Sequence, residues 1–268
     1  MNKISAIIIA KNVASEITPA LLSVKFCQEI ILVDNGSTDN TMEIAKKHGA
    51  KIIRSISSSF ATWRNEGAQL ATGDWLLYVD SDERIDQKLA TEIQRVIKTE
   101  NYSAYTIPRH EIFLGKHFEN WGDSYVLRLI RKSTLKKWHG KLHEQPQIDG
   151  PIGSLKNTLL HLSHKNIDEK VLNTLDWSKS EAKMLFDSNH PPMVWWRFPR
   201  VILTEFWQRA VKQGLWKDGT EGWIEIIYQM FSVFMTYERL WELQRKPSLK
   251  ETYSQIDKDF VAKLKQTL

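Results

Sequence analysis

Short apolar runs alternate with amphipathic segments along the first third of the chain. The apolar runs have strand length and are unbroken, as expected of strands buried on both faces of a parallel sheet. They occupy residues 4–10, 29–33, 51–54 and 75–79. The segments between them have helical spacing and occupy residues 17–26, 42–48 and 60–71. This alternation predicts right-handed βαβ units and an α/β, Rossmann-like domain with a mainly parallel sheet.

The pattern changes in the remainder of the chain. A helix at residues 87–98 precedes strands predicted at 103–109, 125–130 and 154–163, with an irregular stretch at 110–122 and a loop at 138–145. From residue 167 the pattern predicts helices alone, at 169–186, 194–214, 223–243 and 249–264. Pro199 is expected to bend the second of these. We therefore expect one domain at residues 1–165 and a helical C-terminal region at residues 166–268.

The strand predicted at residues 75–79 ends in a cluster of acids, namely Asp80, Asp82 and Glu83. Ligands of open α/β sheets bind at the carboxyl ends of strands, and carboxylates on alternate residues are suitable ligands for a hard divalent cation. The same stretch could instead be a solvated turn, with Asp86 capping the next helix. Asn12 and Asp34 follow two other strands, so one cleft is expected to gather these polar side chains.

Composition narrows the choice of partner and compartment. The 268 residues carry a net charge of +5 and a pI of about 9.1, which suits an anionic substrate or membrane surface. The cations form no dense block of the kind that binds nucleic acid. The single cysteine, Cys27, fits a reducing compartment. Residues 1–10 have the pattern of a strand rather than of a signal peptide, and no apolar run reaches the roughly 18 residues of a membrane span. We expect a cytoplasmic protein.

Four motifs in the first third of the chain follow a known order. They are the strand and turn at residues 7–12, Val33-Asp34-Asn35-Gly36-Ser37-Thr38-Asp39-Asn40-Thr41, Arg64-Asn65-Glu66-Gly67 with Ala71-Thr72-Gly73-Asp74, and Asp80-Ser81-Asp82-Glu83. Each motif is weak alone, but the order and spacing of all four are specific. The chain resembles the inverting glycosyltransferases of family 2, which have the GT-A nucleotide-diphospho-sugar transferase fold. The resemblance implies that residues 1–100 bind a nucleotide sugar and residues 101–165 face the acceptor.

The resemblance also implies a donor pocket, with a UDP-sugar as the expected donor. Asp34 would hydrogen-bond the nucleotide base, and its neighbours in that pocket would be Ala10, Lys11 and Asn12. The ribose and diphosphate would be contacted by Arg64, Asp80 and Ser81. Val13 stands where a glutamate is common in the family, and Glu16 lies too far along to replace it.

A divalent metal, Mg²⁺ or Mn²⁺, is the cofactor that the resemblance implies. Asp82 would be its main ligand, together with Asp80. A metal that bridges the diphosphate neutralises the charge that develops as the sugar departs, and Arg64 could assist electrostatically. His161 follows the apolar pair Leu159-Leu160, at about the place where many GT-A enzymes have a histidine on the metal or diphosphate. His161 is therefore a further candidate ligand, with His164 as the alternative and a structural histidine as the plainer interpretation.

Direct displacement at the anomeric carbon needs a base for the acceptor hydroxyl. The stretch Leu142-His143-Glu144-Gln145 resembles the His-Glu motif of one bacterial branch of the family. Glu144 is therefore the candidate catalytic base. Asp123 and Asp149 are the alternatives, and a surface glutamate in a turn is the structural interpretation.

Tryptophans and cations gather in the C-terminal region. Seven of the eleven tryptophans lie after residue 170, and five cations face the single acid Glu205 between Pro191 and Lys217. This mixture suits an interfacial membrane helix, and predicts a peripheral protein on the inner face of the cytoplasmic membrane. Packing on the first domain or across a dimer is the alternative.

The stretch Asp218-Gly219-Thr220-Glu221-Gly222-Trp223 resembles the tail of bacterial enzymes that add a glucose to the inner core of lipopolysaccharide. The predicted function is metal-assisted transfer of glucose from UDP-glucose to a glycan or lipid-linked glycan, the lipopolysaccharide or lipooligosaccharide core. A nucleotidyltransferase is one alternative, although residues 10–14 lack the Gly- and Arg-rich loop expected of that class. A non-catalytic nucleotide-sugar-binding protein on the same fold is the other.

Overall fold

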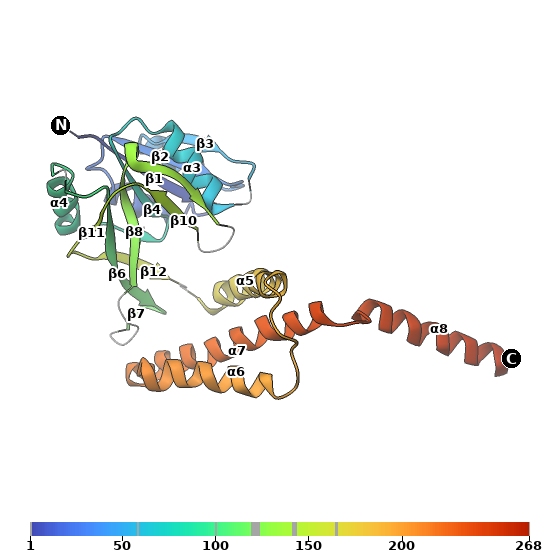
Figure 1. Cartoon of the computed structure of the whole chain (residues 1–268). Coiled ribbons are helices and arrows are strands. Elements are labelled where there is room, and N and C mark those ends of the chain that lie inside the picture. Colours follow the sequence, from blue (N-terminus) through green and yellow to red (C-terminus); the bar gives the residue numbers. More distant parts are fainter. Residues whose placement is uncertain are drawn as a thin grey trace. The chain divides into compact units, whose positions relative to one another are not determined.

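The structure, a computed structural model, describes residues 2–57, 59–99, 101–118, 124–140, 144–163 and 166–267. The chain divides into two compact units, one that ends at Ser163 and one that contains the C-terminal helices. Figure 1 shows the first as a sheet with covering helices and the second as helices alone.

A ten-stranded sheet forms the centre of the first unit, in the order β3-β2-β1-β4-β8-β6-β12-β5, with β7 and β11 also paired to β6. Its first four strands are parallel to one another. They are β1 (Ile4–Ala10), β2 (Glu29–Asp34), β3 (Lys51–Arg54) and β4 (Trp75–Asp80). The helices that connect them are α1 (Ile17–Ser23), α2 (Thr41–Lys47) and α3 (Phe60–Leu70). The βαβ units predicted from hydrophobic spacing are confirmed.

Strand β1 is buried along its whole length, because apolar side chains leave it on both faces. Ile4 and Ile8 join one apolar layer, whereas Ile7 and Ile9 join the other, which α3 covers. Gly67 on α3 makes this packing possible, since a Cβ there would lie 2.5 Å from Cγ2 of Ile7. The glycine of the Arg64-Asn65-Glu66-Gly67 motif is thus explained by close helix–strand contact.

The second half of the sheet is mixed. Strand β8 is antiparallel to both β4 and β6, and β12 is parallel to β6. The elements are β5 (Glu83–Arg84), α4 (Gln87–Val96), β6 (Ala104–Phe113), β7 (Lys116–His117), β8 (Ser124–Arg131), η1 (Lys132–Thr134), β9 (Leu135–His139), β10 (Gln145–Ile148), β11 (Ile152–Ser154) and β12 (Leu159–Ser163). Asp86 caps α4, because its Oδ1 accepts a hydrogen bond from Leu89 N at 2.8 Å.

Three predictions for this half are wrong in detail. The stretch at residues 110–122, expected to be irregular, begins as regular structure, because β6 continues to Phe113 and pairs with β7. The loop expected at residues 138–145 contains parts of the antiparallel pair β9 and β10. The single strand expected at residues 154–163 is two strands, β11 and β12. Apart from β6, the strands concerned are short, and β9 is mostly polar. They therefore lack the apolar run that identifies a strand in a sequence.

The second unit consists of helices. They are α5 (Ile167–Asp187), α6 (Arg197–Phe206), the π-helical turn η2 (Trp207–Lys212), the 3₁₀ turn η3 (Leu215–Asp218), α7 (Gly219–Gln244) and α8 (Leu249–Thr267). Helices α5 and α6 both pack on α7, around the buried residues Ala182, Met193 and Leu240. A buried ion pair between Lys170 and Glu225 also joins α5 to α7.

One expectation for the helical region is corrected. Pro199 lies in the first turn of α6, where a proline is tolerated, and the irregularity falls instead at the π-helical turn. Gly222 lies in the first turn of α7, and a Cβ there would lie 1.9 Å from the carbonyl oxygen of Leu215. Across the described part of the chain, no helix is long and apolar enough to cross a membrane.

Candidate active site

The carboxyl ends of three adjacent strands bring the predicted polar residues together. Strand β1 lies between β2 and β4, with Ala10 paired to Asp34 and Ile9 paired to Asp80. These three strand ends therefore form one continuous edge. Ala10 is buried, whereas Lys11 and Asn12 directly after it are exposed.

The loops after β1 and β2 are joined by side chain–backbone hydrogen bonds. Asn12, with a positive φ of 52°, accepts a hydrogen bond from Thr38 N at 2.7 Å, and its own N–H donates to Ser37 Oγ at 3.0 Å. Asp34 is buried, and its carboxylate accepts hydrogen bonds from the N–H groups of Gly36 and Ser37 at 3.2 Å. In this structure Asp34 shapes the turn that follows β2.

A buried cluster of arginines and carboxylates lies behind the acidic motif. Arg64 of α3 and Arg128 of β8 both contact Asp80, and Arg128 also contacts Glu83 at 2.6 Å. Glu83 is fully buried and accepts a hydrogen bond from Asp80 N at 2.9 Å. Both carboxylate oxygens of Asp80 are thus held by arginines rather than presented to a ligand.

The two carboxyl groups of this cluster differ in proton affinity. Burial alone would raise the pKa of Asp80, but Arg128 and Arg64 outweigh burial and hold that pKa well below its usual range. For Glu83, burial dominates and raises the pKa despite the contact with Arg128. The Asp80 carboxylate is therefore firmly ionised, and Glu83 depends on Arg128 for its charge.

Glu144 reaches the same cluster from the hairpin of β9 and β10. It immediately precedes β10, and its Oε1 accepts a hydrogen bond from Arg64 Nε at 2.9 Å. Asn65 fixes the hairpin on α3 through two hydrogen bonds with the backbone of Trp138, of 2.8 and 3.0 Å. The Trp138 ring lies 4.9 Å from the Arg64 guanidinium. A carboxylate distant in sequence is thereby brought to the acidic motif.

Asp82 has a different environment from Asp80. Its Oδ2 lies 3.3 Å from His161 Nε2, and its Oδ1 is a buried atom without a hydrogen-bond partner among the described residues. His161 Nδ1 in turn lies 2.5 Å from Glu111 Oε2. Burial lowers the pKa of His161, but the hydrogen bonds to Asp82 and Glu111 more than compensate and raise it to about 10.

These residues fit a metal that takes part of its coordination from a substrate. The unpartnered Asp82 Oδ1 and the nearby His161 Nε2 are suitable protein ligands. Glu111 lies behind the imidazole and would orient it, as carboxylates commonly do for metal-binding histidines. No set of three or more His, Cys, Asp or Glu side chains within the described ranges is arranged as a complete metal site.

The other candidates differ in what the structure shows of them. Asp149 is two-thirds exposed and pairs with Lys136 at 2.8 Å, whereas the carboxylates that Arg64 contacts are those of Asp80 and Glu144. Ser81 is half-buried, and its carbonyl oxygen accepts a hydrogen bond from Arg84. Three residues of the sequence-based proposals, Asp123, His143 and His164, lie outside the described residues.

Arg128, Glu111 and Asn65 were not predicted as site residues. Arg128 had a detectable signal, because it interrupts the apolar run Leu127-Arg128-Leu129-Ile130 of a buried strand. A charge in such a position requires a partner of opposite sign. Glu111 and Asn65 carry no comparable signal, since their roles depend on β12 and β9, which are distant in the sequence.

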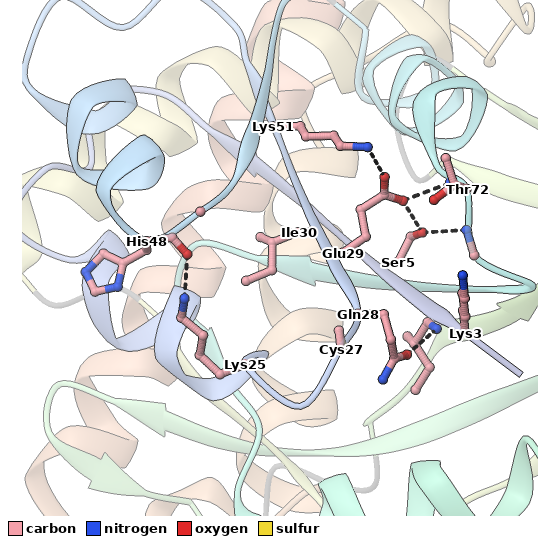
Figure 2. Close-up of a pocket in the computed structure, with 13 residues that line it drawn as sticks. Lys3, Ser5, Lys25, Cys27, Gln28, Glu29, Ile30, His48, Lys51 and Thr72 are labelled. Atoms are coloured by element: carbon pink, nitrogen blue, oxygen red, sulfur yellow. Dashed lines mark hydrogen bonds and ion pairs between the residues drawn. The ribbon is translucent and has the colours of Figure 1, made fainter. Parts of the chain in front are cut away.

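A separate hollow of about 570 Å³ lies at the opposite, amino ends of β1 and β2 (Figure 2). Glu29 accepts hydrogen bonds there from Lys51 Nζ at 2.6 Å, Ser5 Oγ at 2.5 Å and Thr72 N at 2.8 Å. Lys25 Nζ donates to the carbonyl oxygen of His48. These groups satisfy one another, so the network ties strand ends together.

The sequence profile of the family described as "Glycosyl transferase family 2" matches residues 5–156, more than half of the chain. The chain therefore belongs to glycosyltransferase family 2, and the resemblance inferred from its four motifs is confirmed. The match includes β1 to β4, the acidic motif and Glu144.

Curated relatives extend over nearly the whole chain. An uncharacterised glycosyltransferase of Rickettsia typhi is 28% identical over 92% of this chain and 89% of its own length. The lipopolysaccharide core biosynthesis glycosyltransferase LpsC of Rhizobium meliloti is 25% identical over 94% of this chain and 97% of its own length. The similarity thus continues into the helical region.

Two solved structures with UDP or a UDP-sugar bound are similar to this chain. TarS of S. aureus, residues 1–349 in complex with UDP-GlcNAc, is 15% identical with a TM-score of 0.48, over 87% of this chain and 81% of that one. Glucosyl-3-phosphoglycerate synthase of Mycobacterium tuberculosis, in complex with Mn²⁺, UDP and glucosyl-3-phosphoglycerate, is 16% identical with a TM-score of 0.45, over 71% and 81%.

Proposed function

We propose that this glycosyltransferase moves glucose from UDP-glucose to a sugar hydroxyl of the lipopolysaccharide or lipooligosaccharide core, with inversion at the anomeric carbon. The observation that carries the proposal is the bridge from Glu144 through Arg64 to Asp80. It brings a partly exposed carboxylate to the strand end that bears the acidic motif. Direct displacement requires a base in such a position.

The donor occupies the edge formed by the ends of β1, β2 and β4. Ala10, Lys11 and Asn12 border the nucleotide base together with the turn that Asp34 organises. Arg64 is almost fully buried and already bonded to two carboxylates. Its Nη1, a buried atom without a partner among the described residues, is the donor that remains for the ribose or diphosphate. Asp80 contributes by orienting Arg64 and Arg128.

Asp82 and His161 are the residues that would hold Mg²⁺ or Mn²⁺ in this proposal. Such an ion would offset the negative charge of the departing UDP. Asp80 is assigned no metal bond, because arginines occupy both of its carboxylate oxygens.

The chemical step is a single displacement. Glu144 accepts the proton of the acceptor hydroxyl while the acceptor oxygen forms a bond to the anomeric carbon and the bond from that carbon to the UDP oxygen breaks. The hydrogen bond from Arg64 Nε to Oε1 fixes the carboxylate. Attack from the side opposite UDP inverts the anomeric configuration.

The acceptor assignment rests on the relative LpsC and on the likeness of the helical tail. A lipid-linked acceptor places the enzyme at the inner face of the cytoplasmic membrane, with residues 101–165 toward the acceptor. Membership of a glycosyltransferase family favours this activity over nucleotidyl transfer.

A donor and acceptor screen tests the proposal. UDP release would be measured with several nucleotide sugars, Mn²⁺ and truncated core oligosaccharides, and the product anomer would be determined by NMR. The correct donor should also raise the thermal stability of the protein. A product that retains the donor's anomeric configuration would refute the direct displacement. Transfer of a different sugar would refute the donor assignment alone.

A further inference from the structure

An exposed hollow of about 570 Å³ lies where η2, η3 and the start of α7 meet. Its lining is aromatic and aliphatic with two cations, namely Phe206, Val211, Lys212, Trp216, Lys217 and Trp223. We call this the aromatic hollow. Val211, Trp216 and Trp223 are each about half exposed, at 50%, 51% and 46%. Large apolar groups exposed together in this way indicate an interaction surface.

The apolar surface continues along the preceding helix. Leu203 and Trp207 precede Val211 at four-residue steps, and they are 64% and 58% exposed. The π-helical turn begins at Trp207 and ends at Lys212, two residues before the αL residue Gly214. Single π-helical turns within α-helices are frequent at functional sites.

Among the described residues, exposed cations outnumber exposed carboxylates in the lining of the aromatic hollow and on the preceding helix α6, and Glu221, two residues before Trp223, is half-buried. Arg200, Lys212 and Lys217 are exposed, and the Lys217 ammonium lies 5.8 Å from the Trp216 ring. The nearby acid Glu205 is bonded to Arg209 at 2.6 Å. Asp218 is buried. The local excess of accessible charge is therefore positive, and an anionic partner is complementary to it.

Helix α8 offers a useful comparison, because it also exposes a row of apolar side chains. Tyr253, Ile256 and Phe260 are all more than half exposed. However, α8 carries four lysines and three acids, so its charge is nearly balanced. Apolar exposure is therefore common to both segments, and the excess of cations distinguishes the aromatic hollow.

We propose that the aromatic hollow docks on an anionic phospholipid bilayer. The inference rests on the proposed function, and it names the surface through which the enzyme meets a lipid-linked acceptor. Trp216 and Trp223 enter the headgroup layer, where aromatic rings are favourably placed. Lys212 and Lys217 contact lipid phosphate. Phe206 and Val211 contact the first acyl carbons.

Vesicle co-sedimentation of the full chain tests the docking. The wild type should bind vesicles that contain phosphatidylglycerol, bind poorly to pure phosphatidylcholine, and dissociate at high salt. The triple variant Arg200→Gln, Lys212→Gln, Lys217→Gln should bind about a hundredfold more weakly, because each cation near an anionic surface contributes about fivefold. The matched control Lys250→Gln, Lys258→Gln, Lys263→Gln removes the same charge from α8 and should stay within about threefold of the wild type.

A second pair of variants examines the aromatic contribution. Trp216→Ser with Trp223→Ser should reduce binding and remove most quenching of the remaining fluorescence by bromine-labelled acyl chains. Tyr253→Ser with Phe260→Ser on α8 should leave both unchanged. Circular dichroism spectra and melting curves establish that each variant is folded, and the charge variants test the docking independently of the tryptophans.

The docking is overturned if the wild type fails to bind anionic vesicles at low salt, if neutral vesicles bind equally well, or if the α8 control loses as much binding as the triple variant. If the wild type does not bind vesicles but dimerises through these tryptophans, the partner is a second copy of the chain, and the docking is likewise overturned.

Sugar transfer to a detergent-dispersed acceptor is measured separately. Transfer without vesicle binding refutes the docking alone, and vesicle binding without transfer refutes the proposed function alone.

Discussion

Replacement of Arg128 by methionine should destabilise the catalytic unit strongly, because it removes the cation that holds a fully buried carboxylate. Glu83 is completely buried and contacts Arg128 at 2.6 Å. Asp80 loses one arginine but keeps Arg64 at 3.2 Å, and its side chain is 30% exposed. Most of the loss therefore arises at Glu83.

The expected magnitude follows from this asymmetry. Removal of one partner from a buried ion pair typically costs about 3–5 kcal/mol, because the other charge remains buried. That is a large share of a typical unfolding free energy of about 5–15 kcal/mol. A second change, Glu83→Gln, removes the uncompensated charge and should restore at least half of the loss.

The same reasoning fixes the pH dependence. Burial already raises the pKa of Glu83 in the wild type, and loss of Arg128 should raise it further. An acid whose folded-state pKa lies above its unfolded value destabilises the protein as pH rises through that pKa. The loss of unfolding free energy caused by Arg128→Met should therefore be largest at neutral and alkaline pH and should become smaller as pH falls.

Hydrogen exchange measured by mass spectrometry is the suitable assay, because peptides from β1, β4 and β8 report the catalytic unit separately from the helices. Arg131→Met on the same strand is the matched control, since the Arg131 guanidinium stacks on Trp75 at 5.1 Å. The reasoning is refuted if Arg128→Met raises the hydrogen exchange of the β1, β4 and β8 peptides no more than Arg131→Met does. It is also refuted if Glu83→Gln adds to the loss instead of relieving it.

Further predictions concern the two candidate catalytic carboxylates and the amino-end network. Asp82→Ala should abolish Mn²⁺-dependent binding of UDP in calorimetry without unfolding the protein, and full activity in a strong chelator would contradict a metal role. Glu144→Gln should lower kcat about a hundredfold or more with UDP affinity unchanged, whereas Asp149→Asn should remain active. The reverse result would identify Asp149 as the base. Burial would raise the pKa of Glu29, but hydrogen bonds, chiefly from Lys51, lower it to about 2. The ionised Glu29 side chain therefore stabilises the folded protein at pH values above the pKa that Glu29 has in the unfolded chain. Glu29→Gln should thus lose about 1–2 kcal/mol at neutral pH, and urea unfolding should show that difference vanish as pH falls toward 2.

Hydrophobic spacing was sufficient for the parallel half of the sheet. Strands β1, β2 and β4 are buried on both faces, so each appears in the sequence as an unbroken apolar run. The hairpin of β9 and β10 could not be recognised in the same way. Lys136 and Lys137 are exposed within β9, and what fixes this strand is Asn65, which lies 73 residues before Trp138. Local pattern does not report a contact of that range.

The candidate site shows the same difference between what local sequence pattern reports and what long-range contacts determine. Asp80, Asp82 and Asp34 could be located because they directly follow recognisable strands. Their different environments could not, because these depend on which strand lies alongside. Arg128 reaches Asp80 and Glu83 from β8, which is antiparallel to β4. His161 reaches Asp82 because β12 pairs with β5. The sequence of the acidic motif shows three similar acids, whereas the fold makes Asp80 and Glu83 partners of arginine and places Asp82 beside His161.

The charges around the acidic motif explain why a divalent cation suits this end of the sheet. The cluster contains five carboxylates, on Asp80, Asp82, Glu83, Glu111 and Glu144, and three arginines, Arg64, Arg109 and Arg128. With every carboxylate ionised and His161 protonated, as its raised pKa of about 10 requires at neutral pH, five negative and four positive charges leave an excess of one negative charge. Release of the His161 proton, which a metal bond to Nε2 would require, brings that excess to two. The three arginines are bound to Asp80, Glu83, Glu111 and Glu144, whereas Asp82 contacts His161 and keeps an unpartnered Oδ1. A divalent cation at Asp82, as proposed above, would balance the excess, and the arginines would keep the carboxylates that they hold from competing for it.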